Sequence, residues 1–143
     1  MKVMFDTNAF DKAINNIALI SKHLDTISIY ITDVQIIEIA NIPDSKKAKR
    51  SQIFSCLCSI RPILIPHPFT FDRLDFGHFS FQIEPKYRDI LKETGSNKND
   101  ALIAATAIHE GCTLVTNDDE LTKRVLSVSE KVMTFEDFLK ELE

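Results

Sequence analysis

The sequence predicts an α/β protein in which helices cover both faces of a mostly parallel sheet. Short apolar runs rich in β-branched residues alternate with longer stretches of helical periodicity. Such alternation is typical of parallel strands joined by helical crossovers. Acidic residues follow directly after two of the apolar runs, at the edge where open parallel sheets bind ligands. The length fits a single domain, residues 1–143, with a core of its own.

The first apolar run, residues 3–5, ends at Asp6. A central buried strand has this pattern, so Asp6 would lie at its carboxyl end. Thr7 and Asn8 follow, and both can orient a carboxylate by hydrogen bonds. Asp6 could instead only cap the next helix, which we expect over residues 9–23 as one amphipathic segment.

A second strand is expected over residues 27–31, with a helix after it that Thr32 or Asp33 can cap. Glu38 projects from this otherwise apolar helix, next to its buried side. Because burying an unpaired acid is costly, Glu38 needs a partner unless it lies on a solvated outer face. Helical spacing predicts the buried side to consist of Val34, Ile37 and Ala40 or Asn41.

Four cations cluster at the start of the next predicted helix, which continues through Leu57: Lys46, Lys47, Lys49 and Arg50. Two interpretations stay open for this cluster. It could contact the phosphate backbone of a nucleic acid, or it could be a solvated helix face. Cations at a helix N-terminus oppose the helix dipole, which slightly favours the functional interpretation.

A short proline-bounded strand is expected at residues 63–65, before an irregular segment at residues 66–85. This segment holds half of the ten phenylalanines of the chain. Its aromatic side chains could stack on bases or form a partner surface, although folding back onto the body is the more ordinary outcome. An extra edge strand at residues 79–83 and a helix from Tyr87 to Gly95 are also expected.

A helix, a turn and a buried strand are predicted ahead of Asp118. Asn99 or Asp100 can cap the helix, whose many alanines would allow close approach to a sheet. Gly111 is a good helix stop, and residues 112–116 form a run rich in β-branched residues. A helix packed antiparallel on its following strand would bring Asp100 and Asp118 to the same edge of the sheet.

Three further elements are predicted after this strand. Helical spacing near residues 121–126 and an apolar run at residues 132–134 suggest a helix and a last strand. A C-terminal helix begins near Phe135. Apart from the extra edge strand at residues 79–83, the chain therefore supplies five candidate strands, and right-handed crossovers are expected between them.

Composition and charge narrow the classes of function. The formal net charge is −4, so any nucleic-acid binding must come from a local basic face. Three cysteines without an export signal predict reduced thiols in a cytoplasmic protein. Cys56 and Cys58 fit helix core and surface better than a zinc site, because no second pair completes a tetrad. No apolar run approaches the ~18 residues of a membrane span.

Four separated blocks resemble the PIN domain family of metal-dependent nucleases. They are MKVMFDTN at residues 1–8, TDVQIIEIA at 32–40, NDALIAATAI at 99–108 and LVTND at 114–118. The blocks occur in the family's order and span most of the chain. The resemblance implies a three-layer α/β/α fold with a five-stranded sheet of order 3-2-1-4-5. The strands that end at Asp6 and Thr116 would then be neighbours at the topological switch point.

The same resemblance implies a metal site made of four carboxylates: Asp6, Glu38, Asp100 and Asp118. Such hard oxygen ligands select Mg²⁺ or Mn²⁺ over zinc, and without a cation some of them would hold protons. Glu38 would be a ligand or a base that orients water, and Thr116 would bond to a carboxylate or a water. Asp119 rivals Asp118, although the family's Thr-x-Asp phasing favours Asp118.

The implied function is a Mg²⁺- or Mn²⁺-dependent endoribonuclease that hydrolyses RNA phosphodiester bonds. The small single-domain size resembles the VapC-like toxins of type II toxin–antitoxin modules, which implies an RNA substrate, a cognate antitoxin and a homodimer. An RNA-processing nuclease and a non-catalytic PIN-like binding module are the alternatives. A haloacid-dehalogenase-like phosphatase is disfavoured, because Asn8 takes the place of the second acid of its Asp-x-Asp motif.

Overall fold

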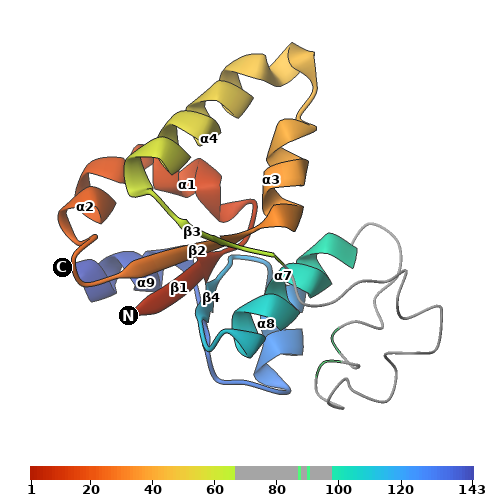
Figure 1. Ribbon diagram of the computed structural model, residues 1–143. Coiled ribbons are helices and arrows are strands. Elements are labelled where there is room, and N and C mark those ends of the chain that lie inside the picture. Colours follow the sequence, from red (N-terminus) through yellow and green to blue (C-terminus); the bar gives the residue numbers. More distant parts are fainter. Residues whose placement is uncertain (67–86, 88–89, 91–97) are drawn as a thin grey trace.

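The computed structural model describes residues 1–66, 87, 90 and 98–143, and its strands form one parallel sheet (Figure 1). The order is β3-β2-β1-β4-β5, and every pairing is parallel. The expected order is therefore confirmed, with β1 at the centre. The strands are β1 (Lys2–Phe5), β2 (Ser28–Thr32), β3 (Ile63–Ile65), β4 (Thr113–Val115) and β5 (Val132–Met133).

Helices cover both faces of the sheet, as the sequence predicts. Figure 1 shows α1, α2 and α4 on one side of the strands and α7 and α8 on the other. Buried residues of α9 belong to the same core as those of α1, α2 and α4. The bounds are α1 (Ala9–Asn15), α2 (Ile17–Lys22), α3 (Asp33–Ala40), the 3₁₀ turn η1 (Asp44–Lys46), α4 (Lys47–Ile60), α7 (Lys98–His109), α8 (Asp119–Leu126) and α9 (Phe135–Leu142).

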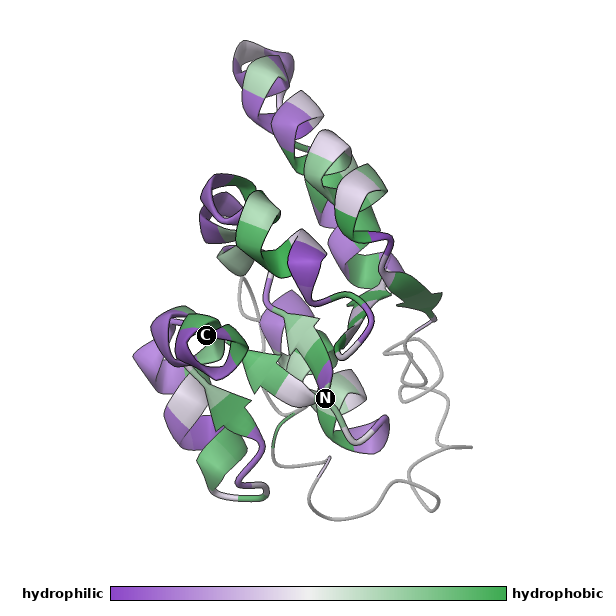
Figure 2. Ribbon diagram, turned by 90° about the vertical axis from the view of Figure 1, so that its left-hand side faces the viewer, coloured by the Kyte–Doolittle hydropathy of each residue, from purple (hydrophilic) through white to green (hydrophobic). Residues whose placement is uncertain are grey.

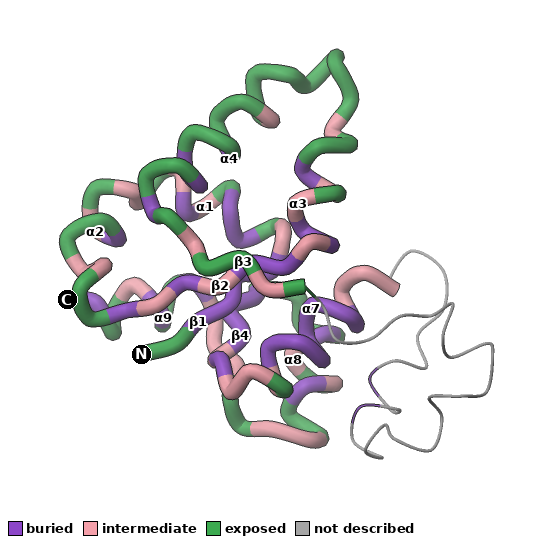
Figure 3. Tube along the Cα trace, viewed as in Figure 1, coloured by how far each residue is buried: buried purple, intermediate pink, exposed green. Residues whose placement is uncertain are grey.

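β1 is buried on both faces, because its side chains alternate between two cores. Val3 and Phe5 lie in the core beneath α1, α4 and α9, whereas Met4 lies in the core beneath α7 and α8. All three are fully inaccessible to solvent. Figure 3 shows the buried residues concentrated along the strands, and Figure 2 shows the same strands mainly in hydrophobic colours. A near-continuous apolar run therefore gives a central strand.

The helix predicted over residues 9–23 is two helices, because Asn16 interrupts it. Its backbone angles, φ −119° and ψ 14°, are not helical. Its side-chain Nδ2 donates to the carbonyl oxygen of Lys12 at 2.8 Å, and its own carbonyl accepts from Leu19 and Ile20. Asparagine competes with the helix for backbone groups in this way. The single-helix prediction was wrong because the apolar periodicity continues across the break.

The capping of α3 determines which side of it is buried. Thr32 Oγ1 accepts from the Gln35 amide at 3.3 Å, and Gln35 Oε1 accepts from the Thr32 amide at 2.9 Å, which completes a capping box. Gln35 is fully buried, and its Nε2 donates to the Phe5 carbonyl. The predicted buried side was right for Val34 and wrong for the rest, because this bond turns α3 so that Ile37 is 58% exposed and Ala40 is exposed as well. The buried residues are Val34, Gln35 and Ile39.

The remaining sequence predictions have mixed outcomes. α7 begins at Lys98, so Asn99 and Asp100 lie in its first turn rather than capping it. Cys56 is buried and Cys58 exposed, as expected of helix core and surface. The phenylalanine-rich segment 66–85 lies outside the described residues except for Pro66, and so do its expected edge strand and most of the helix expected up to Gly95. No helix among the described residues combines the length and hydrophobicity needed to cross a membrane.

Candidate active site

The structure brings the four predicted acids to the carboxyl edge of the sheet. Asp6 follows β1, Glu38 lies in α3 after β2, Asp118 follows β4, and Asp100 lies in the first turn of α7. Asp100 is half-buried, and burial is the main reason why its pKa rises to about 6. The negative charges of the other three acids raise that pKa further. The positive charge of Arg124 in α8 lowers the pKa of Asp100 in part. The four carboxyl groups therefore share one electrostatic environment.

Asp6 is the most deeply buried of these acids, with 3% of its surface exposed. Its Oδ2 accepts from Thr116 Oγ1 at 2.6 Å, and its Oδ1 accepts from the backbone N–H of Asn8 at 2.5 Å. Burial raises the pKa of Asp6, with smaller contributions from Asp118 and Glu38, while both hydrogen bonds lower it. The two bonds fix the orientation of the carboxylate at the end of β1.

Glu38 has the polar partners that its apolar helix requires. Thr7 Oγ1 donates to Glu38 Oε2 at 2.5 Å, and Asn99 Nδ2 donates to Glu38 Oε1 at 2.9 Å. Thr7 comes from the loop after β1 and Asn99 from α7, so three segments meet at this carboxylate. The sequence predicts Asn99 only as a candidate helix cap, not as a residue of the site. Its position next to an acid in a helical first turn was the one available signal for a role at the site.

Asp118 combines a structural contact with a place at the acidic edge. Its Oδ1 caps α8 by accepting from the amides of Glu120 at 2.8 Å and Leu121 at 3.0 Å. Its own amide donates to Thr116 Oγ1 at 3.1 Å, so Thr116 connects Asp118 with Asp6. Asp119 is the exposed first residue of α8. Among the described residues, the charges that raise the pKa of Asp6 and Asp100 include Asp118 and not Asp119.

A cavity of about 240 Å³ opens beside Asp6 and Asp118, and Lys12 is the one basic side chain among the described residues that line it. In the described part of the chain, no three His, Cys, Asp or Glu side chains are gathered closely enough to hold a metal ion by themselves. The donor chemistry nevertheless fits a hard divalent cation, because every acid offers carboxylate oxygen. Mg²⁺ also keeps several waters, so it needs few direct protein ligands.

The basic cluster predicted as a nucleic-acid contact lies away from these acids. Figure 1 shows η1 and the beginning of α4 as the part of the molecule farthest above the sheet. Lys49 Nζ lies 2.8 Å from Asp11 Oδ2, and Arg50 Nη2 lies 2.8 Å from Asp44 Oδ1. These ion pairs neutralise part of the cluster. Lys46 and Lys47 are exposed at the same end of α4.

Comparisons with known proteins agree with this architecture. The crystal structure of PAE2754 from Pyrobaculum aerophilum superposes with a TM-score of 0.66 and 21% identity, over 99% of this chain and 98% of that chain. The crystal structure of VapBC2 from Rickettsia felis, bound to a DNA fragment from their promoter, gives a TM-score of 0.59 and 23% identity, over 94% and 98% of the two chains. At these identities the likeness shows the fold.

The sequence comparisons give the family. No curated protein matches the sequence significantly. A family model described as the PIN domain matches residues 3–125, and this range includes β2, β3 and β4, all of β1 but its first residue, and all four acids of the carboxyl edge. Because the model covers well over half of the chain, the protein belongs to the PIN domain family.

Proposed function

We propose that this chain is a Mg²⁺- or Mn²⁺-dependent endoribonuclease, with Asp6, Glu38, Asp100 and Asp118 as its site. PIN domains are generally nucleases. The observation that carries the proposal is the meeting of the acids at one edge of the sheet, where Thr116 connects Asp6 with Asp118 and bonds from Thr7 and Asn99 hold Glu38. After burial, the charges of the other three acids also raise the pKa of Asp100. Proteins bring carboxylates together, despite their mutual repulsion, at sites that bind a cation or a proton.

Each of these residues would have a separate role at the site. Asp6, Asp100 and Asp118 would hold the cation, with Asp6 pre-oriented by Thr116 and by the Asn8 amide. Glu38 would orient the attacking water, since bonds from Thr7 and Asn99 fix both of its oxygens. A bound divalent ion supplies Lewis acidity for phosphodiester hydrolysis. The exposed cations at the start of α4 would contact the RNA backbone farther along.

We further propose that the protein is the toxin of a type II toxin–antitoxin module, acts in the cytoplasm as a homodimer, and is held inactive by an antitoxin. The structural likeness to VapBC2 extends over nearly the full length of both chains, which supports this assignment. A PIN nuclease that acts in RNA processing would carry the same four acids, so the acids do not distinguish it from a toxin. Co-expression with the product of a neighbouring small reading frame tests the toxin assignment, because that product should abolish RNA cleavage.

The test of the nuclease function is cleavage of a mixed RNA pool in Mg²⁺, Mn²⁺ or EDTA. We compare the wild type with Asp100→Asn and with Asp25→Asn, which makes the same change at the opposite edge of the sheet, ahead of β2. All proteins are first shown to be folded by circular dichroism and free of antitoxin. We expect metal-dependent cleavage by the wild type and Asp25→Asn, and a loss on the order of 100-fold or more in Asp100→Asn.

Two results would contradict the nuclease function in different ways. Cleavage that persists in EDTA, or equally in Asp100→Asn, points to a contaminant or a different site. If the wild type cleaves no RNA and also binds no Mn²⁺ by calorimetry, the chain is a non-catalytic binding module. The absence of three closely gathered metal-ligating side chains among the described residues is the observation that favours this second candidate.

A further inference from the structure

Lys12 places a positive charge in a cavity that is otherwise lined by acidic, amide and small side chains. It projects from α1, and the described lining residues are Asp6, Asn8, Ala9, Lys12, Asn117 and Asp118. Two of these are acids of the candidate active site. A lysine at this position would offset part of their charge. It also faces the space that a substrate must enter to reach them.

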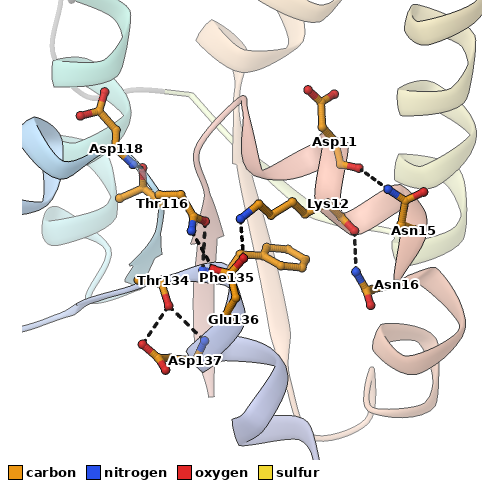
Figure 4. A network of polar contacts seen from close by, with 11 residues as sticks. Asp11, Lys12, Asn15, Asn16, Thr116, Asp118, Thr134, Phe135, Glu136 and Asp137 are labelled. Atoms are coloured by element: carbon orange, nitrogen blue, oxygen red, sulfur yellow. Dashed lines mark hydrogen bonds and ion pairs between the residues drawn. The ribbon is translucent and has the colours of Figure 1, made fainter.

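A short network of polar contacts holds the Lys12 ammonium group (Figure 4). Lys12 Nζ lies 2.5 Å from Glu136 Oε1, and Glu136 Oε2 accepts from Asn117 Nδ2 at 2.7 Å. Asn117 Oδ1 in turn accepts from the backbone amide of Phe135 at 3.2 Å. The network joins α1, the loop after β4 and the start of α9. The lysine is therefore directed by two other segments of the chain.

The bond between Lys12 and Glu136 is one that an anionic ligand can replace. The side chains are 41% and 56% exposed. Exposed ion pairs of this kind contribute little to stability, so exchanging one anion for another has a small energetic cost. A phosphodiester group carries a full negative charge and several acceptor oxygens. The lysine ammonium offers three donors on a flexible stem, which suits a phosphate without fixing its orientation.

We propose that Lys12 binds a backbone phosphate of the RNA and positions the strand over the acidic cavity, with the phosphate replacing Glu136 as its partner. This inference rests on the nuclease function proposed above. Glu136 and Asn117 hold the ammonium group ready in the absence of RNA. A purely structural role, in which the pair only ties α1 to α9, is the competing explanation.

The experiment measures binding of a fluorescein-labelled single-stranded RNA by fluorescence anisotropy at several salt concentrations. Ca²⁺ replaces Mg²⁺, and the probe is checked for integrity by gel. For Lys12→Met we expect affinity to fall about three- to tenfold. We also expect the slope of log K against log salt to shrink by about 0.7, the value for one lost phosphate contact on a single strand. Lys12→Arg should keep the slope of the wild type.

The matched control is Lys140→Met, because Lys140 also forms an ion pair with an acid in the first turn of α9, at 2.8 Å from Asp137. It does not line the cavity beside Asp6. We expect it to bind RNA as the wild type does. Glu136→Gln should tighten binding, because Lys12 no longer has to leave a carboxylate. The same change in the Lys12→Met background should have a smaller effect.

The outcomes separate this inference from the nuclease function on which it rests. If the wild type cleaves RNA in Mg²⁺ but Lys12→Met binds it with unchanged affinity and slope, the role of Lys12 is wrong and the nuclease function stands. Weaker binding with an unchanged slope and no rescue by Lys12→Arg identifies the structural role. A wild type that neither binds nor cleaves RNA overturns both proposals.

Discussion

Glu38 shows how a single carboxylate can hold distant parts of the chain together. Its oxygens accept from Thr7, which lies 31 residues earlier, and from Asn99, which lies 61 residues later. The sequence predicted that an acid in so apolar a helix needs a partner, because an unpaired buried acid is costly. It did not identify Asn99, since a local pattern says nothing about which side chain 61 residues away will be in reach.

Asp100 should make the stability of the metal-free protein depend on pH. Its pKa is about 6 in the folded state against an ordinary 3.8, first because of burial and then because of the other acids. Well below pH 3.8, the carboxyl group is protonated in both states and does not change the free energy of unfolding. As the pH rises towards ~6, the unfolded chain releases this proton more readily than the folded one, so the free energy of unfolding falls.

We therefore expect the wild type in EDTA to lose more stability between about pH 4.5 and about pH 7 than Asp100→Asn does. Urea unfolding followed by circular dichroism measures both proteins. Asp25→Asn serves as the control and should follow the wild type. Added Mg²⁺ should narrow the difference, because a nearby cation favours the ionised carboxylate. An equal pH dependence in EDTA for the wild type and Asp100→Asn would contradict the raised pKa.

At the scale of the elements, the start of α3 controls where Glu38 points. Thr32 and Gln35 close a capping box at its first turn, and the Gln35 side chain also bonds to the Phe5 carbonyl at the end of β1. The base of α3 is thereby fixed to the strand that ends at Asp6. A change in the conformation of this first turn would move Glu38 relative to Asp6.

Thr32→Ala should therefore lower both stability and metal affinity. Loss of the cap should cost about 1 kcal/mol in urea unfolding. Mn²⁺ affinity, measured by calorimetry, should fall several-fold because Glu38 is less well held. Thr134→Ala is the matched control, since Thr134 caps α9 by accepting from the Asp137 amide at 3.1 Å. It should cost similar stability and leave Mn²⁺ affinity unchanged. Equal Mn²⁺ affinities in the two variants would show that the cap of α3 does not position Glu38.

Most elements could be predicted because apolar periodicity distinguishes strands from helices. Two of the errors have a common physical origin in bonds between polar side chains and the backbone. Asn16 divides α1 from α2 by bonding to the Lys12 carbonyl, and Gln35 turns α3 by bonding to β1. Neither bond changes the spacing of apolar residues. A pattern of hydrophobic positions therefore cannot reveal them.

For the whole molecule, the topology was predictable only in combination with the resemblance to a family. Alternating strands and helices predict a parallel sheet, but they leave the strand order open. Once the order is known, acids that follow β1 and β4 must share an edge. The contact between Lys12 and Glu136 spans 124 residues and depends on the docking of α9, which no motif encodes. It could be found only from the structure.

The two ends of the described chain share one aromatic core, and this makes α9 part of the fold. Phe138 meets Phe5 of β1 with ring centroids 5.2 Å apart, and both rings are fully buried. Phe138→Ala should therefore cost about 3–5 kcal/mol in urea unfolding. Leu126→Ala removes a side chain that is 54% exposed and should change stability by less than about 0.5 kcal/mol. A similarly small effect for Phe138→Ala would mean that α9 contributes little to the core.

The central position of β1 also bears on when the site forms during translation. β1 pairs with β4, and Thr116, which bonds to Asp6, lies 110 residues farther along the chain. A growing polypeptide that has not reached this point carries Asp6 and Glu38 without the neighbouring strand that fixes them. The acidic site therefore stays unassembled until Thr116 has been added to the chain. The four acids can come together only after the ribosome has synthesised β4 and the residues that follow it.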